Sequence, residues 1–149
     1  IFTDLTPLAE KSGITLELAG DGVMTGSDAL IYRMIFNLTE NAIKYNRPDG
    51  SVRVCITQEP EKLLILVSDT GRGIPEEYQQ SIFQPFFRVD KSRSRTFGGA
   101  GLGLALVWEI AALHGGSVRV AESSDSGTTI AAELPRSGNH AADPKNETL

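Results

Sequence analysis

The β-prone stretches of this 149-residue chain arrive in pairs, and that pairing limits the folds open to it. Runs of aliphatic and β-branched residues at 52–56 and 64–67 flank a Glu-Pro-Glu turn, and runs at 118–121 and 129–134 flank Ser126-Gly127. Such short turns join antiparallel neighbours, whereas a doubly wound parallel sheet alternates single strands with helices. Residues 14–18 and 23–25, around Gly20-Asp-Gly22, are expected to form a further hairpin.

Three helical patterns lie between these strands. The first covers residues 1–12, the second can be capped by Ser27 or Asp28 and runs to about residue 45, and the third covers 102–113 and is apolar almost all round. We therefore expect an α+β fold, a two-layer sandwich with helices packed on one face of a mixed, mostly antiparallel sheet. We expect one domain over residues 1–135 and a disordered tail over 136–149, which is polar and aperiodic.

Composition excludes several classes of protein. A formal net charge of −5 argues against a generally basic nucleic-acid-binding surface, so no nucleic-acid partner is expected. The single cysteine, Cys55, excludes an internal disulfide. The sequence contains no run of about 18 apolar residues and no secretory signal. Because it begins at Ile1, we expect a piece of a longer protein.

The second helix carries a polar strip along the edge of its apolar face. At about 100° per residue, Asn37, Asn41 and Lys44 lie within about 60° of one another. Two carboxamides and an ammonium group placed there can hold a metal ion and an anionic oxygen. A solvated face with an incidental pair of asparagines is the alternative. The neighbouring apolar face comprises Ile31, Met34, Ile35, Leu38 and Ala42.

Two glycine-rich segments offer backbone that a ligand can approach. Asp69-Thr-Gly71-Arg-Gly73 puts a carboxylate at a strand end, where it can accept a hydrogen bond from an exocyclic amine such as that of adenine; an ordinary turn is the alternative. Gly98-Gly-Ala-Gly101-Leu-Gly103 precedes the apolar helix, where free N–H groups favour an anion; a flexible hinge is the alternative. The second segment is neither a Walker A loop nor a dinucleotide fingerprint.

The segment between these glycines, 70–98, has no long periodic element beyond a short helix from Pro75, and we expect it to act as a lid. Its basic run, which includes Arg88 and Lys91, is either a solvated charge cluster or a clamp for a polyanion. The phenylalanines at 83, 86 and 87 either anchor this lid or fill the core.

Together these segments resemble a known family in order and spacing. Asn37-Leu-Thr-Glu-Asn41-Ala-Ile-Lys-Tyr45, Asp69-Thr-Gly71-Arg-Gly73-Ile, residues 82–90 and Gly99-Ala-Gly101-Leu-Gly103-Leu resemble the N, G1, F and G2 boxes of bacterial sensor histidine kinases. The resemblance covers residues 1–135 and includes His114-Gly-Gly116 and Gly127-Thr-Thr129. It implies a catalytic and ATP-binding domain with the Bergerat fold, which gyrase, Hsp90 and MutL share.

The resemblance also implies roles for individual residues. Asn37, Asn41 and Lys44 would form the catalytic centre at the ATP phosphates, with Asn41 holding Mg²⁺. Tyr45 would pack against adenine, and Asp69 would bind its amine. The other expected nucleotide contacts are Gly71, Gly73 and Ile74 around the base, Arg88 and Lys91 in the lid, Gly99, Gly101, Leu102 and Gly103 at the phosphates, and Thr128 and Thr129 at the base end. Ala100 stands where many relatives carry a small hydroxyl residue.

As an activity, the resemblance implies transfer of the ATP γ-phosphoryl group to a histidine on a separate dimerisation domain that precedes Ile1. The expected partners are that domain and a response regulator, in a full-length homodimer whose ATP-binding domain is cytoplasmic and whose other parts reach the plasma membrane. Neither His114 nor His140 has the setting of the acceptor. An ATP-hydrolysing or nucleotide-sensing relative is the alternative, but hydrolysing relatives use a glutamate at the position of Asn37, and an amide cannot serve as that base.

Overall fold

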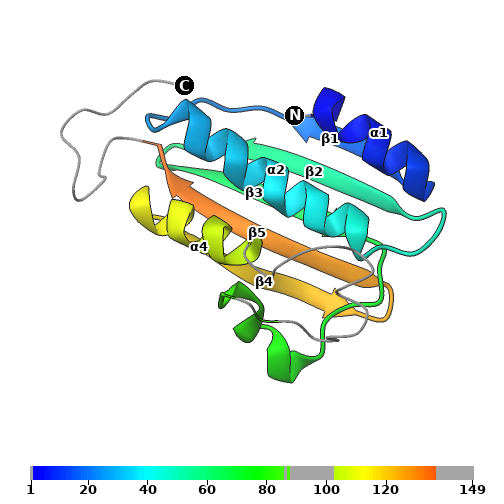
Figure 1. Ribbon diagram of the computed structural model, residues 1–149. Coiled ribbons are helices and arrows are strands. Elements are labelled where there is room, and N and C mark those ends of the chain that lie inside the picture. The colour runs from blue at the N-terminus through cyan, green and yellow to red at the C-terminus, as the bar shows by residue number, and fades with distance from the viewer. Residues whose placement is uncertain (1, 86, 88–102, 137–149) are drawn as a thin grey trace.

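The computed structural model describes residues 2–85, 87 and 103–136 (Figure 1). Its elements follow in the order α1 (Phe2–Ser12), β1 (Thr15–Gly20), α2 (Asp28–Lys44), β2 (Ser51–Gln58), β3 (Lys62–Asp69), the 3₁₀ helices η1 (Glu76–Tyr78) and η2 (Ser81–Phe83), α4 (Gly103–Leu113), β4 (Ser117–Ser124) and β5 (Gly127–Pro135). The expected short helix after Pro75 is therefore present as η1. Within the described residues, no helix is long and apolar enough to span a membrane.

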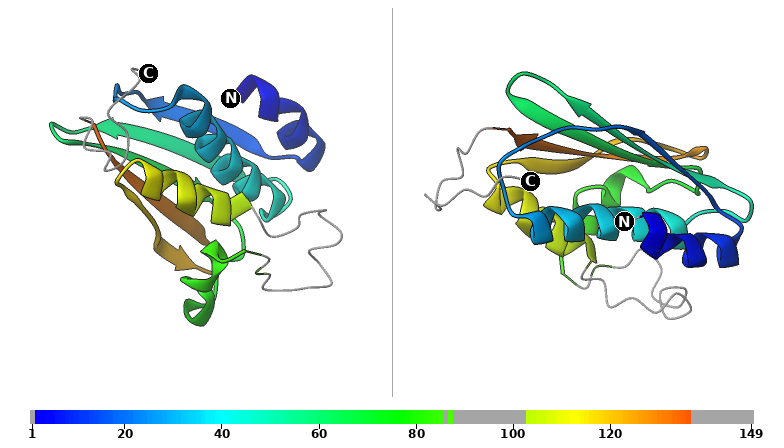
Figure 2. Two further views of the ribbon diagram at one scale, coloured as in Figure 1. Left: turned by 60° about the vertical axis from the view of Figure 1, so that its left-hand side comes forward. Right: turned by 90° about the horizontal axis from the view of Figure 1, so that it is seen from above.

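The five strands form one mixed sheet in the order β1-β2-β3-β5-β4. β1 runs parallel to β2, and the other three pairs are antiparallel. The helices cover one face of this sheet, as the view from above in Figure 2 shows. The expected two-layer, mostly antiparallel fold is confirmed.

The expected hairpin of residues 14–18 with 23–25 is wrong. β1 pairs with β2 instead, with Thr15 opposite Ser51. The partner strand of β1 therefore follows α2 in the chain. At Gly20, φ is +80° and an added Cβ would lie 2.0 Å from the Ile56 carbonyl oxygen. Only glycine tolerates both this angle and this contact. The chain can therefore leave β1 at Gly20 and turn away from the sheet toward α2.

The α2 helix begins where Ser27, and not Asp28, supplies the cap: the Leu30 N–H donates to the Ser27 hydroxyl oxygen at 3.3 Å. Its apolar residues recur at helical spacing and turn toward the sheet. The buried residues of this helix are Ile31, Met34, Leu38, Thr39, Ala42 and Ile43.

His114 fixes the direction in which α4 packs on α2. Its Nε2 accepts the Ser27 N–H at 3.1 Å, and its Nδ1 donates to the Ile110 carbonyl oxygen at 2.8 Å. Those two bonds require one neutral tautomer. Because His114 follows α4 and Ser27 precedes α2, the helices lie antiparallel. The N-terminal end of α4 therefore lies beside the C-terminal half of α2 (Figure 2).

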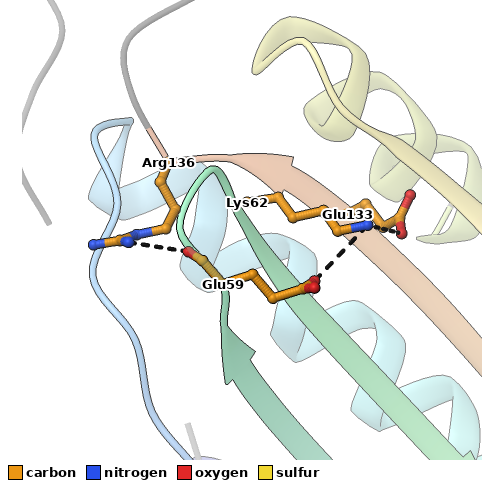
Figure 3. Close-up of polar contacts among 4 residues, drawn as sticks. All are labelled: Glu59, Lys62, Glu133 and Arg136. Carbon is orange, nitrogen blue, oxygen red and sulfur yellow. Dashed lines mark hydrogen bonds and ion pairs between the residues drawn. The ribbon is translucent and has the colours of Figure 1, made fainter.

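Arg136 makes several hydrogen bonds at the end of the domain where α2 begins, and Figure 3 shows the one to Glu59. Its guanidinium donates to the carbonyl oxygens of Val23 and Glu59, at 3.0 Å each, and of Pro60, at 3.3 Å. Its backbone N–H donates to the Glu61 carbonyl oxygen at 2.9 Å. Arg136, the first residue of the expected tail, is thus held by the turn between β2 and β3. Residues 137–149 lie outside the described part, and their expected disorder stays a prediction.

A second contact ties the same turn to β5. The Lys62 ammonium lies 3.0 Å from Glu133 Oε1 and 3.8 Å from Glu59 Oε2, as Figure 3 shows. These groups are well exposed, so water screens the attraction and the ion pairs contribute little stability.

We predict that Arg136→Ala lowers the free energy of unfolding by about 1–3 kcal/mol, because three carbonyl oxygens lose a charged donor. Urea denaturation measures this change, with Arg53→Ala, an exposed arginine of β2, as the matched control. Equal stability of Arg136→Ala and Arg53→Ala would show that the β2–β3 turn does not depend on this guanidinium.

Candidate functional site

A row of polar side chains crosses three strands at one end of the sheet. The register places Asp69 of β3 opposite Thr128 of β5, and Thr128 opposite Ser123 of β4. Paired residues on adjacent strands point to the same face, and Asp69 follows the buried Ile65 and Val67 in alternation. Asp69, Thr128 and Ser123 therefore face the layer of helices.

Asp69 keeps one oxygen available for a ligand. Its Oδ1 accepts the Gly71 N–H at 2.8 Å and the Thr128 N–H at 3.3 Å. Oδ2 makes no hydrogen bond to any residue that the structure describes. Burial raises the pKa of the Asp69 carboxyl, although the two N–H donors act in the opposite direction.

The backbone after Asp69 lies tightly between α2 and the hairpin of β4 and β5. A Cβ on Gly71 would lie 2.6 Å from the Tyr45 carbonyl oxygen. At Gly73, φ is +81° and a Cβ would lie 2.1 Å from the Ser124 carbonyl oxygen. Larger residues would force both walls apart, which accounts for glycine at these two positions.

Hydroxyl groups extend the row beyond Asp69. The Ile74 N–H donates to Ser123 Oγ at 2.7 Å, and Ser123 Oγ lies 2.9 Å from Thr128 Oγ1. Thr128 is only 5% exposed. Gly71, Ile74 and Thr128 thus lie in one hydrogen-bonded group with Asp69 and Ser123, and their expected contacts with a nucleotide stay a prediction.

Thr129 does not belong to this group. Its hydroxyl lies 2.8 Å from that of Ser68, the residue before Asp69 on β3. Because successive residues of a strand point to opposite faces, this pair lies on the face of the sheet away from Asp69. Thr129 and Thr128 thus point to opposite faces of the sheet.

A network that the sequence reasoning missed ties the end of α2 to the strands. Asn46 Oδ1 accepts the Thr70 hydroxyl at 2.9 Å and the Arg47 N–H at 2.8 Å, and Asn46 Nδ2 donates to the Ser51 carbonyl oxygen at 2.8 Å. The Arg47 guanidinium donates to the Asp125 carbonyl oxygen. In the sequence, the only feature that indicates this network is the preference of Asn for turns that follow helices.

The polar strip of α2 is half-buried, as expected for residues at the edge of an apolar face. Asn37, Asn41 and Lys44 all have partly exposed side chains, and the Lys44 ammonium lies 3.7 Å from Glu40 Oε1. Tyr45 follows the helix; it is 41% exposed, and its N–H donates to the Asn41 carbonyl oxygen at 3.2 Å.

Of the remaining expected site residues, only Gly103 lies in the described part of the chain. Gly103 begins α4, and an added Cβ would meet nothing within 4 Å, so the position does not require glycine for space. The others, Arg88, Lys91, Gly99, Gly101 and Leu102, lie outside the described residues.

Of the phenylalanines at 83, 86 and 87, which are expected either to anchor the lid or to fill the core, the structure describes the first and the last. Phe83 is buried, and its ring centroid lies 5.5 Å from that of Trp108 on α4, so this side chain fills the core. Phe87 is half-buried against Tyr78, with 5.7 Å between ring centroids. Phe86 lies outside the described residues.

The described residues include no group of three or more His, Cys, Asp or Glu side chains that could together hold a metal.

Comparison with known proteins gives a consistent result. A family model described as histidine kinase-, DNA gyrase B-, and HSP90-like ATPase matches residues 26–138. The sensor histidine kinase RppB of Synechocystis sp. is 38% identical over 117 residues, which cover 78% of this chain and 26% of RppB. The chain thus spans about a quarter of that relative's length.

Solved structures agree in fold. The mycobacterial sensor histidine kinase MprB is 30% identical, with a TM-score of 0.78 and coverage of 91% of this chain and 93% of that one. Full-length ShkA in complex with AMPPNP is 26% identical, with a TM-score of 0.78 and coverage of 93% of this chain and 29% of ShkA.

The raised pKa of Asp69 predicts a pH-dependent stability. A carboxyl with a raised pKa in the folded state contributes stability below its unfolded pKa and loses that contribution as the pH rises through the folded pKa. Relative to Asp69→Asn, which keeps an Oδ1 acceptor, the wild type should therefore lose free energy of unfolding as the pH rises above about 4, the ordinary pKa of an aspartate. Denaturation of both proteins across this range measures it, and a difference independent of pH would contradict it.

Proposed function

This chain belongs to the family of histidine kinase-, DNA gyrase B- and HSP90-like ATPases, as a histidine kinase catalytic domain, and we propose that it binds Mg²⁺-ATP and passes the γ-phosphoryl group to a histidine. The observation that carries the proposal is the half-buried Asp69 carboxylate, which faces the helices and keeps Oδ2 available beside glycine backbone.

The base end of the site fits adenine. Oδ2 of Asp69 can accept a hydrogen bond from the exocyclic amine. Glycines at positions 71 and 73 let the loop after Asp69 pack closely against the carbonyl oxygens of Tyr45 and Ser124. Tyr45, at the end of α2, supplies an exposed aromatic ring near this loop. The AMPPNP complex of ShkA supports an adenine nucleotide as the ligand of this fold.

The phosphate end would lie along α2 and the start of α4. Asn37, Asn41 and Lys44 form one half-buried strip, and the antiparallel packing brings the N-terminus of α4 beside them. A helix N-terminus favours phosphate, and the Lys44 ammonium can leave Glu40 for a phosphate oxygen. We assign Asn41 as the side chain that holds Mg²⁺, whose charge would offset that of the phosphates. The contributions of Arg88, Lys91, Gly99, Gly101 and Leu102 remain part of the proposal.

Transfer to a histidine is favoured over hydrolysis by the residues on α2. Asn37 has no basic atom with which to activate water. Glu40, the nearest acid on this helix, lies about 60° from Asn37 on the helical wheel, on the side away from the apolar face and toward the rim of the site. The site can therefore position and neutralise the phosphates while leaving the attacking group to come from elsewhere.

The acceptor is proposed to lie on a dimerisation domain of the same polypeptide, since RppB is about four times as long as the matched region. We further propose that the full-length protein is a homodimer, that its phosphohistidine serves a response regulator, and that this domain works on the cytoplasmic side of a membrane-anchored sensor.

The assignment of Asn41 predicts a loss of metal-dependent binding. In calorimetric titrations with AMPPNP, Asn41→Ala should reduce the gain in affinity on adding Mg²⁺ by about ten- to a hundredfold, because an oxygen ligand is removed. Binding without Mg²⁺ should change far less.

Arg53→Ala is the control, since Arg53 is an exposed residue of β2, outside α2 and its polar strip. A magnesium-dependent gain that is the same in Asn41→Ala and Arg53→Ala would remove Asn41 from the metal site.

The absence of a base at position 37 predicts slow hydrolysis. Supplied with Mg²⁺-ATP, the isolated chain should release phosphate well below about 1 s⁻¹. The full-length polypeptide should instead retain the γ-phosphoryl group as an acid-labile histidine adduct. Fast phosphate release that Glu40→Gln abolishes would contradict this assignment and favour the hydrolysing alternative.

A further inference from the structure

Ser123 is the one polar side chain of the strand row that the proposed function leaves without a role. It lies opposite Thr128 in the register of β4 with β5, on the face that carries Asp69. Its hydroxyl contacts two parts of the site at once, the Ile74 N–H at 2.7 Å and Thr128 Oγ1 at 2.9 Å.

The Ser123 hydroxyl accepts a hydrogen bond from the Ile74 N–H and keeps its own proton to donate. A hydroxyl has one proton to donate, and its oxygen here already accepts from the backbone. Accepting a hydrogen bond polarises the O–H group and makes it a better donor. Across the 2.9 Å contact with Thr128 Oγ1 either hydroxyl could be the donor, and we take Ser123 as the donor.

We propose that Ser123 is a positioning residue for base selection, acting by directing the Thr128 hydroxyl proton into the pocket beside Asp69. This inference rests on the proposed function, because it takes the base of the bound nucleotide to be the group read at this site. Thr128 accepts from Ser123 and keeps its own proton for the ligand. Since Thr128 is nearly buried, that proton is directed to a partner inside the site and not to bulk water.

The result is an acceptor and a donor side by side. Asp69 Oδ2 accepts, and Thr128 O–H donates. Adenine offers the complement on its Watson–Crick edge, an amine donor next to the N1 acceptor. Hypoxanthine and guanine offer the reverse, a carbonyl acceptor next to an N1–H donor, so both of their contacts would be mismatched. Ser123 thus makes the pocket selective for 6-aminopurine nucleotides.

The test compares ADP with inosine diphosphate, which differs from ADP at the two atoms being read. Calorimetric titration of the wild type should show preference for ADP. Ser123→Ala should weaken ADP binding by about three- to tenfold and inosine diphosphate binding by less than about twofold, because the Thr128 proton is no longer directed. Ser123→Thr keeps the hydroxyl and should restore the preference.

A matched control lies on the other face of the same strands. Ser68 makes the equivalent hydroxyl contact with Thr129, at 2.8 Å, so Ser68→Ala removes a similar bond without touching the Asp69 row. It should leave both affinities unchanged. A second variant, Thr128→Val, should reduce the preference by itself, and adding Ser123→Ala to it should have no further effect on the ratio.

Equal losses for both nucleotides in Ser123→Ala would show a purely structural role and overturn the inference, as would an additive effect in the double variant. In either case wild-type ADP binding stands, and so does the proposed function. A wild-type chain that binds neither nucleotide would overturn the proposed function together with this inference.

Discussion

The register between β3, β5 and β4 is the constraint on which the site depends. It sets Asp69, Thr128 and Ser123 in one row on the helix-covered face. A shift of one residue in either pairing would turn the hydroxyls to the opposite face, where Ser68 and Thr129 now meet. The buried alternation of β3 and β5 opposes such a shift, because it would expose the core side chains of both strands. The fold and the site are thus specified by the same hydrogen-bonded pairing.

The packing of the helices positions the other half of the site relative to these strands. His114 joins the end of α4 to the start of α2, which sets the two helices antiparallel and brings the start of α4 to the polar strip. At the far end of α2, Asn46 and Thr70 bind the helix terminus to the loop after Asp69. Base and phosphate ends of the proposed nucleotide site are therefore held at a fixed separation by packed secondary structure, since the proposed ligand contacts come from α2 and from the strand row as well as from the loops.

Local patterns predicted the parts of this structure that depend on nearby residues. The helical face of α2, the hairpins of β2 with β3 and of β4 with β5, and the position of Asp69 at a strand end all follow from periodicity and turn chemistry. The parallel pairing of β1 with β2 did not, because its partner lies beyond α2 and local glycines suggested a hairpin. The face of Thr129 and the contacts of Ser123 also needed the register, since neighbouring threonines in a sequence look alike until their strand is aligned.

The central claim is that an adenine nucleotide binds with its base on Asp69 and its phosphates between α2 and α4. The most direct measurement is a crystal structure of this chain with AMPPNP and Mg²⁺. We expect the adenine amine within hydrogen-bonding distance of Asp69 Oδ2 and the phosphates beside Asn41 and Lys44. A nucleotide bound in the reverse orientation, or on the open face of the sheet near Ser68, would contradict it.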